Sequence, residues 1–164
     1  MFVDSHCHLD FPEFAGRMPE IRRAMAQNQV TDALCVSVSL ETLPAVLALA
    51  QEHPNFYASV GVHPDHREGR EPSREELLQL AARPKVVAIG ETGLDYYRES
   101  GDTEWQRDRF RNHIRAARAC GKPLIVHTRC AADDTLRIMR EEGAGEVGGV
   151  MHCFTESRET AEAA

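Results

Sequence analysis

Short apolar runs rich in β-branched residues recur along the chain, and helix-like stretches separate them. Six runs predict strands, and they begin near Phe2, Asp32, Phe56, Val86, Pro123 and Gly148. These runs are apolar almost throughout, which is typical of strands with both faces buried. Strands that alternate with helices indicate parallel βαβ units.

The stretches between the runs carry helix start and stop signals. We expect helices through 19–25, through 43–50 after a Ser39 cap, after the capping-box pairs Ser73/Glu76 and Thr103/Gln106, and after Asp133 or Asp134. Gly121, with Pro123 just beyond it, is a normal end for the helix that follows Thr103. The last stretch, 157–164, has the pattern of a newly capped helix of about two turns.

Ionisable residues close the predicted strands and decide between two architectures, a doubly wound open sheet and a (βα)8 barrel. Five of the six strands end in such residues, namely His6 and His8, His63, Glu91, His127 and His152. In a barrel the carboxyl ends form one ring, whereas in an open sheet they are spread along an edge at about 4.8 Å per strand. We therefore predict an α/β fold of the TIM-type (βα)8 barrel class.

The length of the chain limits how much of such a barrel it can hold. At the spacing of the predicted strands, 164 residues contain about six βα units, whereas eight units need roughly 220 residues. We expect a single barrel domain over residues 1–164 that is C-terminally incomplete, without strands seven and eight. The first and sixth strands would then leave unpaired sheet edges.

Composition and charge narrow the class of protein. Apolar residues make up 42% of the chain and charged residues 27%, an ordinary balance for a soluble globular protein. The net charge of −7 disfavours non-specific nucleic-acid binding through a basic surface. It does not exclude a nucleic-acid substrate, because bound metal cations can supply positive charge locally.

The cysteines and the apolar runs indicate where the protein works. Five cysteines are an odd number without a CxxC pair, so we expect free thiols and a reducing compartment. No apolar run approaches the roughly 18 residues of a membrane span, and the N-terminus lacks a secretory signal pattern. A cytoplasmic location without membrane association is the expectation.

The pair His6 and His8 gains meaning from the later strand ends. Alternating side chains place both on one face of the first strand, although such a pair alone is more often ordinary surface or loop histidine. With Glu91, His127 and His152 they form a set too large for one zinc site, which takes three or four protein ligands. The set suits two divalent ions about 3.5–4 Å apart, with the Glu91 carboxylate between them. The metal stays open among magnesium, zinc, manganese, iron and nickel.

Five longer motifs follow one another along the chain: MFVDSHCHLD (1–10), GVHP (61–64), AIGETGLDYY (88–97), KPLIVHTR (122–129) and GGVMHCFTES (148–157). They closely resemble the TatD family of metal-dependent deoxyribonucleases, which is part of the amidohydrolase superfamily. The resemblance implies a (βα)8 barrel and metal-dependent hydrolysis of phosphodiester bonds in DNA. It further implies a 3′-to-5′ exonuclease with single-stranded DNA ends as its substrate.

The resemblance also implies roles for single residues. By motif match the metal ligands are His6, His8, Glu91, His127 and His152, and Glu91 is also the catalytic candidate. His63, in the GxHP motif, would contribute to the substrate pocket. Arg129 lies two residues past His127 and can share its strand face, where a guanidinium could hold a phosphate bidentately. A structural ion pair is the equally open alternative for Arg129.

Asp95, Tyr96 and Tyr97 follow Glu91 on the loop after the fourth strand. They can line the substrate cleft, and either tyrosine can stack on a base, although packing within the loop is the alternative. Trp105 is expected to pack rather than to bind.

Two departures from the family pattern leave the activity open. Asp65 stands where many members have a second histidine, and the chain lacks the TDxPY-like motif whose aspartate closes strand eight. That aspartate is expected to orient the attacking water and accept its proton. Two alternatives to a nuclease therefore remain. One is an ester or amide hydrolase, such as a D-aminoacyl-tRNA deacylase, on the same metal site, and the other is a catalytically inactive metal-binding fragment.

Overall fold

A computed structural model describes residues 1–97 and 101–164 of the chain. Its strands are β1 (Phe2–Cys7), β2 (Val30–Cys35), β3 (Phe56–Val60), β4 (Val86–Asp95), β5 (Leu124–Arg129) and β6 (Gly149–Met151). Its α-helices are α1 (Met18–Gln27), α2 (Leu43–Glu52), α3 (Arg74–Ala81), α4 (Glu104–Cys120), α5 (Ala132–Glu141) and α6 (Arg158–Ala163). Two short 3-10 helices, η1 (Pro12–Phe14) and η2 (Ala144–Glu146), complete the described elements.

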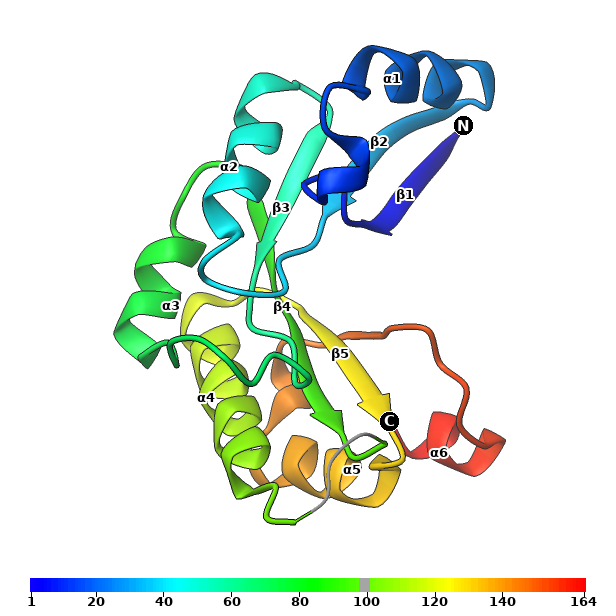
Figure 1. Cartoon of the computed structure of the whole chain (residues 1–164). Coiled ribbons are helices and arrows are strands. Elements are labelled where there is room, and N and C mark those ends of the chain that lie inside the picture. Colours follow the sequence, from blue (N-terminus) through cyan, green and yellow to red (C-terminus); the bar gives the residue numbers. More distant parts are fainter. Residues whose placement is uncertain (98–100) are drawn as a thin grey trace.

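The strands form one parallel sheet in the order β1-β2-β3-β4-β5-β6. A doubly wound sheet reverses its strand order at a switch point, whereas a barrel adds its strands in chain order. Here the order is sequential, and α2, α3 and α4 follow one another along one side of the sheet (Figure 1). The sheet is therefore a half-barrel, and the predicted fold class is confirmed.

The central strands are buried, whereas the edge strands are not. Phe56 in β3 and Ile89 in β4 have no exposed surface. In contrast, Phe2 and Val3 in β1 are 64% and 63% exposed, and Val150 in β6 is 54% exposed. The prediction that the apolar runs are buried on both faces is right for the centre of the sheet and wrong for its edges. An edge strand has a neighbouring strand on one side only.

Serines begin two helices as the sequence predicts. Oγ of Ser73 and Oγ of Ser157 accept hydrogen bonds from the backbone N–H three residues on, at 3.1 and 3.2 Å. Ser39 instead caps the turn before α2, where it accepts from the N–H of Thr42 at 3.2 Å. Helix α5 begins one residue before the two aspartates that were predicted to precede it.

The capping box predicted for Thr103 and Gln106 is wrong. Thr103 does precede α4, but its hydroxyl accepts a hydrogen bond from the Arg107 guanidinium at 3.1 Å and does not cap the helix. Gln106 is fully buried and turns toward β4, where it binds the backbone of Asp95. Gln106 therefore forms its hydrogen bonds with the end of β4, which is distant in sequence, and not with the start of its own helix.

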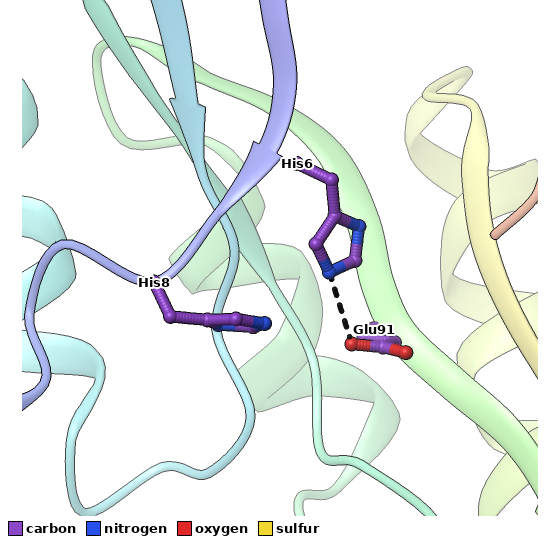
Figure 2. Close-up of side chains that lie close together, drawn as sticks. All are labelled: His6, His8 and Glu91. Atoms are coloured by element: carbon purple, nitrogen blue, oxygen red, sulfur yellow. Dashed lines mark ion pairs between the residues drawn. The ribbon is translucent and has the colours of Figure 1, made fainter. Parts of the chain in front are cut away.

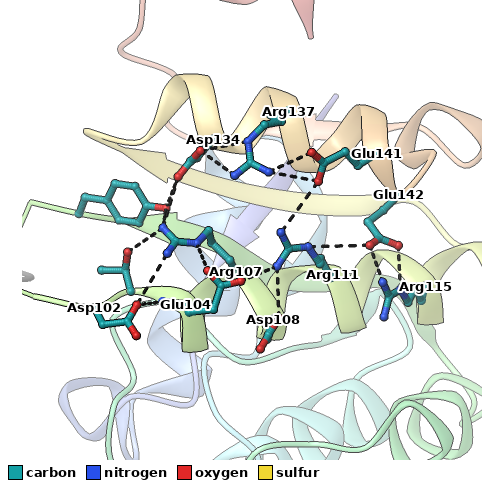
Figure 3. Close-up of polar contacts among 12 residues, drawn as sticks. Asp102, Glu104, Arg107, Asp108, Arg111, Arg115, Asp134, Arg137, Glu141 and Glu142 are labelled. Carbon is teal, nitrogen blue, oxygen red and sulfur yellow. Dashed lines mark hydrogen bonds and ion pairs between the residues drawn. The ribbon is translucent and has the colours of Figure 1, made fainter.

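Charged side chains join α4 to α5 on their solvent side (Figure 3). Arg107 is 3.4 Å from Asp134, and Arg115 is 2.6 Å from Glu142, which follows α5 directly. These pairs are partly exposed to solvent, and surface ion pairs contribute roughly 0–1 kcal/mol each. They help to orient the two helices, while the apolar faces beneath them supply most of the stability.

All five cysteines are free, as their odd number predicts. Cys7 and Cys35 lie opposite each other on β1 and β2. None of the helices that the structure describes is both long enough and apolar enough to span a bilayer.

Candidate metal centre

Glu91 on β4 lies where the strand ends converge. Its Oε2 atom is 3.2 Å from Nε2 of His6 on β1, and its Oε1 atom is 3.2 Å from Nδ1 of His127 on β5. His63, which follows β3, brings its Nε2 atom to 3.7 Å from the same Oε1. His8, just past β1, also points toward Glu91 (Figure 2). Four segments that are distant in sequence thus meet at one carboxylate.

The possible ligand atoms form two groups that share Glu91. His6, His8 and Glu91 make one group, and His63, Glu91 and His127 make the other. Within each group, one ligand atom per residue lies within 4.8 Å of the others. The sequence placed His63 in the substrate pocket, whereas the structure also brings its ring into the second group of possible ligands.

His152 stacks on His6 and belongs to neither group. The two ring centroids are 3.4 Å apart, and the rings are nearly parallel, at 8°. His152 follows β6, the last strand of the described sheet, and borders the same open hollow as His8, His63 and His127. Its role as a metal ligand stays a prediction.

Hydrogen bonds on the far side of two rings fix their orientation. Nδ1 of His8 donates to the carbonyl oxygen of Val36 at 3.1 Å, so its Nε2 atom carries the free lone pair. Nε2 of His127 donates to Oδ2 of Asp95 at 3.1 Å, which leaves Nδ1 facing Glu91. Metal-binding histidines are commonly held in this way by a carbonyl or a carboxylate.

Asp95 was predicted on a loop, but it is the last residue of β4 and only 4% exposed. Its N–H donates to Oε1 of Gln106, and Nε2 of Gln106 donates to its carbonyl oxygen, both at 2.9 Å. Sequence reasoning named Asp95 as a possible cleft residue but missed its hydrogen bond to His127. One feature of the sequence could have indicated the contact between Gln106 and Asp95. Gln106 lies on the buried face of α4, in line with Phe110 and His113, where a polar side chain needs a partner.

Gly93 allows β4 and β5 to approach closely enough for this contact. A Cβ atom at this position would lie 2.0 Å from the carbonyl oxygen of His127, and its φ angle is +138°. Only glycine adopts that backbone freely and leaves room for the neighbouring strand. The GETG sequence thus carries both the central carboxylate and the glycine that lets the next strand pack beside it.

The donor set fits a divalent cation. Nε2 of His6 is buried and has no hydrogen-bond partner among the described residues, although Oε2 of Glu91 is 3.2 Å away. His127 donates from Nε2, so its Nδ1 lone pair faces an oxygen lone pair of Glu91 unless a proton or a metal lies between them. Neutral imidazoles and a carboxylate are ligands that zinc, manganese and nickel accept.

Burial and neighbouring charges shift the pKa values of the site. Burial alone would raise the pKa of the Glu91 carboxyl, but the contacts with His127 and His6 outweigh it and hold the pKa well below its ordinary value. Burial lowers the pKa of His63 to about 4 and also lowers the pKa of His152. Burial acts in the same direction on His127, but the two flanking carboxylates outweigh it and raise that pKa. At neutral pH the site combines an ionised carboxylate with neutral His63 and His152.

An open hollow of about 490 Å³ is bordered by Glu91 and by His8, His63, His127 and His152, and Phe11 and Val38 add apolar walls to it. Arg129, Tyr96 and Tyr97 are not among the described residues that border this hollow.

Arg129 and the two tyrosines lie beyond the hollow. Arg129 is exposed, and its guanidinium carbon is 3.8 Å from the centroid of the Tyr97 ring. The Tyr96 hydroxyl donates to a carboxylate of α5 at 2.8 Å, so this side chain is held against α5. Trp105 packs against the guanidinium of Arg109, 4.9 Å away, in agreement with its predicted packing role.

The chain matches one protein family, and several relatives, over nearly its whole length. The family model described as TatD related DNase matches residues 3–164. The uncharacterized metal-dependent hydrolase YcfH of Escherichia coli K12 is 44% identical over 164 residues, which cover 97% of this chain and 61% of that protein. The uncharacterized metal-dependent hydrolase YabD of Bacillus subtilis is 36% identical over 162 residues, which cover 98% of this chain and 64% of YabD.

Solved structures show the same fold. The crystal structure of YjjV, a TatD homologue from Escherichia coli K12, matches with a TM-score of 0.90 and 32% identity, covering 99% of this chain and 63% of that one. A TatD family hydrolase from Entamoeba histolytica matches with a TM-score of 0.83 and 25% identity, covering 98% of this chain and 60% of that one. The chain thus spans about three fifths of the length of its relatives. With its half-barrel and its histidine-rich strand ends, the chain belongs to the TatD-related DNase family of metal-dependent hydrolases.

Proposed function

We propose that this chain supplies most of a two-metal centre that hydrolyses phosphodiester bonds in DNA, as a 3′-to-5′ exonuclease on single-stranded ends. The observation that carries the proposal is that the two oxygens of Glu91 face two separate groups of histidines. The description of the matching family as DNases supports DNA as the substrate. Because the chain spans about three fifths of its relatives, activity of these 164 residues by themselves is part of the proposal.

Divalent ions in such a centre supply an activated water near neutral pH and polarise a phosphoryl oxygen. Glu91 would bridge the two ions, one oxygen to each. His6 and His8 would hold the first ion, and His127, with His63 or His152, would hold the second. Asp95 keeps the His127 ring in place through its hydrogen bond to Nε2.

Arg129 is proposed to hold a phosphate of the substrate. It lies two residues beyond His127 on β5, and stacking on Tyr97 fixes the plane of its guanidinium at the strand end. A planar guanidinium can donate two parallel hydrogen bonds to a phosphate. The Arg129–Tyr97 pair would thus contact the strand beyond the hollow, next to the scissile bond.

The proposal is tested by the release of nucleotides from single-stranded DNA in the presence of Mg²⁺, Mn²⁺ or Zn²⁺. We expect Glu91→Gln to lower the rate by about 100-fold or more, because the amide cannot bridge two cations. Glu75→Gln is the matched control, since Glu75 is an exposed carboxylate in the first turn of α3. We expect that variant to keep the full rate.

Two outcomes would reject the proposal. The first is hydrolysis of an aminoacyl ester or an amide, but not of DNA, with the same dependence on Glu91. The second is bound metal without hydrolysis of any of these substrates, which would make the chain an inactive metal-binding fragment.

A further inference from the structure

His63 lies in a long connection that runs from the end of β3 to the start of α3 and passes beside α4 (Figure 1). The connection turns directly after His63, because the N–H of His66 donates to the carbonyl oxygen of His63 at 3.0 Å. The ring itself is tied at Nδ1, which accepts a hydrogen bond from the N–H of Asp65 at 3.1 Å. Where this short turn sits decides where Nε2 of His63 points.

Arg109 of α4 holds this turn from outside the sheet. Its guanidinium donates to the carbonyl oxygen of His63 at 2.7 Å and to that of His66 at 2.9 Å. Nε donates to both carboxylate oxygens of Glu71 at 3.0 and 2.9 Å, and this ion pair balances the charge of the buried guanidinium. The Arg109 side chain is only 3% exposed, so its guanidinium is shielded from water, whereas the Glu71 carboxylate is 53% exposed. A rigid fork of five donors thus grips both ends of the turn and the segment that leaves it.

Two neighbours of Arg109 on the same face of α4 hold the connection on either side of the turn. Nε2 of His113 accepts a hydrogen bond from the N–H of Val62 at 3.2 Å, and Nδ1 of His113 donates to the carbonyl oxygen of Arg109 at 2.8 Å. The amide of Asn112 donates to the carbonyl oxygen of Pro72 at 2.7 Å. Residues three and four apart share a helix face, so α4 presents all three side chains to this one connection.

We propose that Arg109 is a positioning residue that sets the His63 ring for the metal centre. A buried arginine is costly unless every donor has a partner. Here the partners are the Glu71 carboxylate and two carbonyl oxygens of the turn that carries His63. The inference rests on the proposed metal centre in one respect, that the second group of ligand atoms, His63, Glu91 and His127, binds an ion. Arg109 touches neither the substrate nor the ion and acts through His63.

Three variants test the role of Arg109. Arg109→Met keeps most of the side-chain volume and removes every donor, and Arg109→Lys keeps the charge but cannot reach all three partners at once. Arg115→Met is the matched control, because Arg115 lies on the same helix and makes a bidentate pair with Glu142, at 2.7 and 2.6 Å, on the exposed side. Circular dichroism establishes whether each variant is folded. If Arg109→Met does not fold, the comparison is made with Arg109→Lys instead.

The first measurement needs no metal. In the protein with labelled histidine, we expect the ring resonances of His63 to shift or broaden in Arg109→Met, to shift less in Arg109→Lys and to stay in place in Arg115→Met. Unchanged His63 resonances in folded Arg109→Met would overturn the proposal, whatever the activity of the protein. This readout separates a positioned ring from a general loss of stability.

The second measurement is Co²⁺ binding, followed by visible absorbance. Loss of a group that orients a metal ligand typically costs on the order of 10–100-fold in affinity, and we expect this loss in Arg109→Met. Combined with His63→Ala, Arg109→Met should add no further loss, because the group that it positions is already gone. An equal loss with and without the His63 ring would show a merely structural role and reject the proposal.

The two proposals fail in different ways. A chain that shows this coupling between Arg109 and His63 but does not cleave DNA would reject the nuclease and keep the positioning role. A chain that cleaves DNA but shows no coupling between Arg109 and His63 would reject the positioning role and keep the nuclease.

Discussion

His127 lies between two carboxylates, Glu91 and Asp95, and each contacts a different ring nitrogen. Both residues are on β4, four positions apart, so they approach the ring of the neighbouring strand from the same side of the sheet. The two carboxylates have different tasks in the proposed centre. Asp95 fixes the orientation of the ring, while Glu91 offers oxygens to the cations. A proton or a cation between His127 and Glu91 removes the repulsion between their lone pairs.

His113 links a single buried side chain to the pH dependence of stability. Burial lowers its pKa from 6.5 to about 4, and both ring nitrogens are engaged in the neutral form. Between pH 6.5 and 4 the unfolded chain binds a proton here that the folded chain does not. Stability from this residue is therefore complete above pH 6.5 and falls as the pH is lowered toward 4, by about 3 kcal/mol in all.

Urea unfolding at pH 7.5, 6, 5 and 4.5 measures this effect. His113→Gln can still accept the hydrogen bond from Val62 but does not titrate, so we expect a shallower decline of stability with acid. The pKa of His63 is also lowered to about 4, and its contribution is present in both proteins, so the difference between the two slopes isolates His113. Parallel slopes would contradict the assignment of a neutral His113.

At the scale of elements, helix α4 contacts three different parts of the molecule, each through a separate stripe of its surface. One stripe of the helix packs into the core through Phe110 and Ile114, which have no exposed surface. The stripe with Arg109 and His113 holds the connection after β3. The solvent stripe pairs with acidic residues on and beside α5 (Figure 3). By its composition, the stripe with Arg109 and His113 would be predicted to face solvent. Its polar groups are buried instead, because they form hydrogen bonds with backbone atoms of another segment.

The close pairing of β4 and β5 makes a sharp prediction. Gly93→Ala places a methyl group against the carbonyl oxygen of His127 and forces a positive φ angle on alanine. We expect a loss of about 3 kcal/mol or more in the free energy of unfolding, together with weaker Co²⁺ binding, because the strands that carry Glu91 and His127 must separate.

Gly145→Ala is the control for that measurement. Nothing lies within 4 Å of a Cβ atom at Gly145, so its unfolding midpoint in urea should stay close to that of the unmodified chain. If the two alanine variants unfold at the same urea concentration, the close approach of β4 and β5 is not a constraint on the fold.

At the scale of the whole molecule, the half-barrel has two sheet edges in the part of the chain that the structure describes, β1 and β6. Both expose apolar side chains, including Phe2 and Val150. An edge strand offers unpaired backbone groups to other chains, and apolar side chains make that contact more favourable. The same edges flank the metal centre, since His6 and His8 are at the end of β1 and His152 is at the end of β6.

We therefore expect the 164-residue chain to self-associate as its concentration rises. Val150→Lys should reduce the association measured by sedimentation velocity, because a charge on the exposed face of β6 opposes strand pairing. Gln79→Lys on the exposed side of α3 adds the same single charge to the net charge of −7 and should leave the association unchanged. A chain that stays monomeric at every concentration would contradict the expectation.

The sequence by itself determined the order of strands and helices, the half-barrel and the set of ionisable strand ends. These are local properties. An apolar run marks a buried strand, a serine before a helix satisfies its first N–H groups, and a parallel strand carries its last side chains to one edge of the sheet. For that reason His6, His8, Glu91 and His127 could be named together before any distance was known.

Only the tertiary structure decided which side chain faces which. It brought His63 into a group with Glu91 and His127, turned Gln106 from a helix cap to the backbone of Asp95, and placed Arg109 on the turn that holds His63. Each of these contacts joins segments that are distant in sequence, and each polar group is buried only because a partner from elsewhere replaces water. Periodicity records which face of an element is buried. It does not record what the buried face meets.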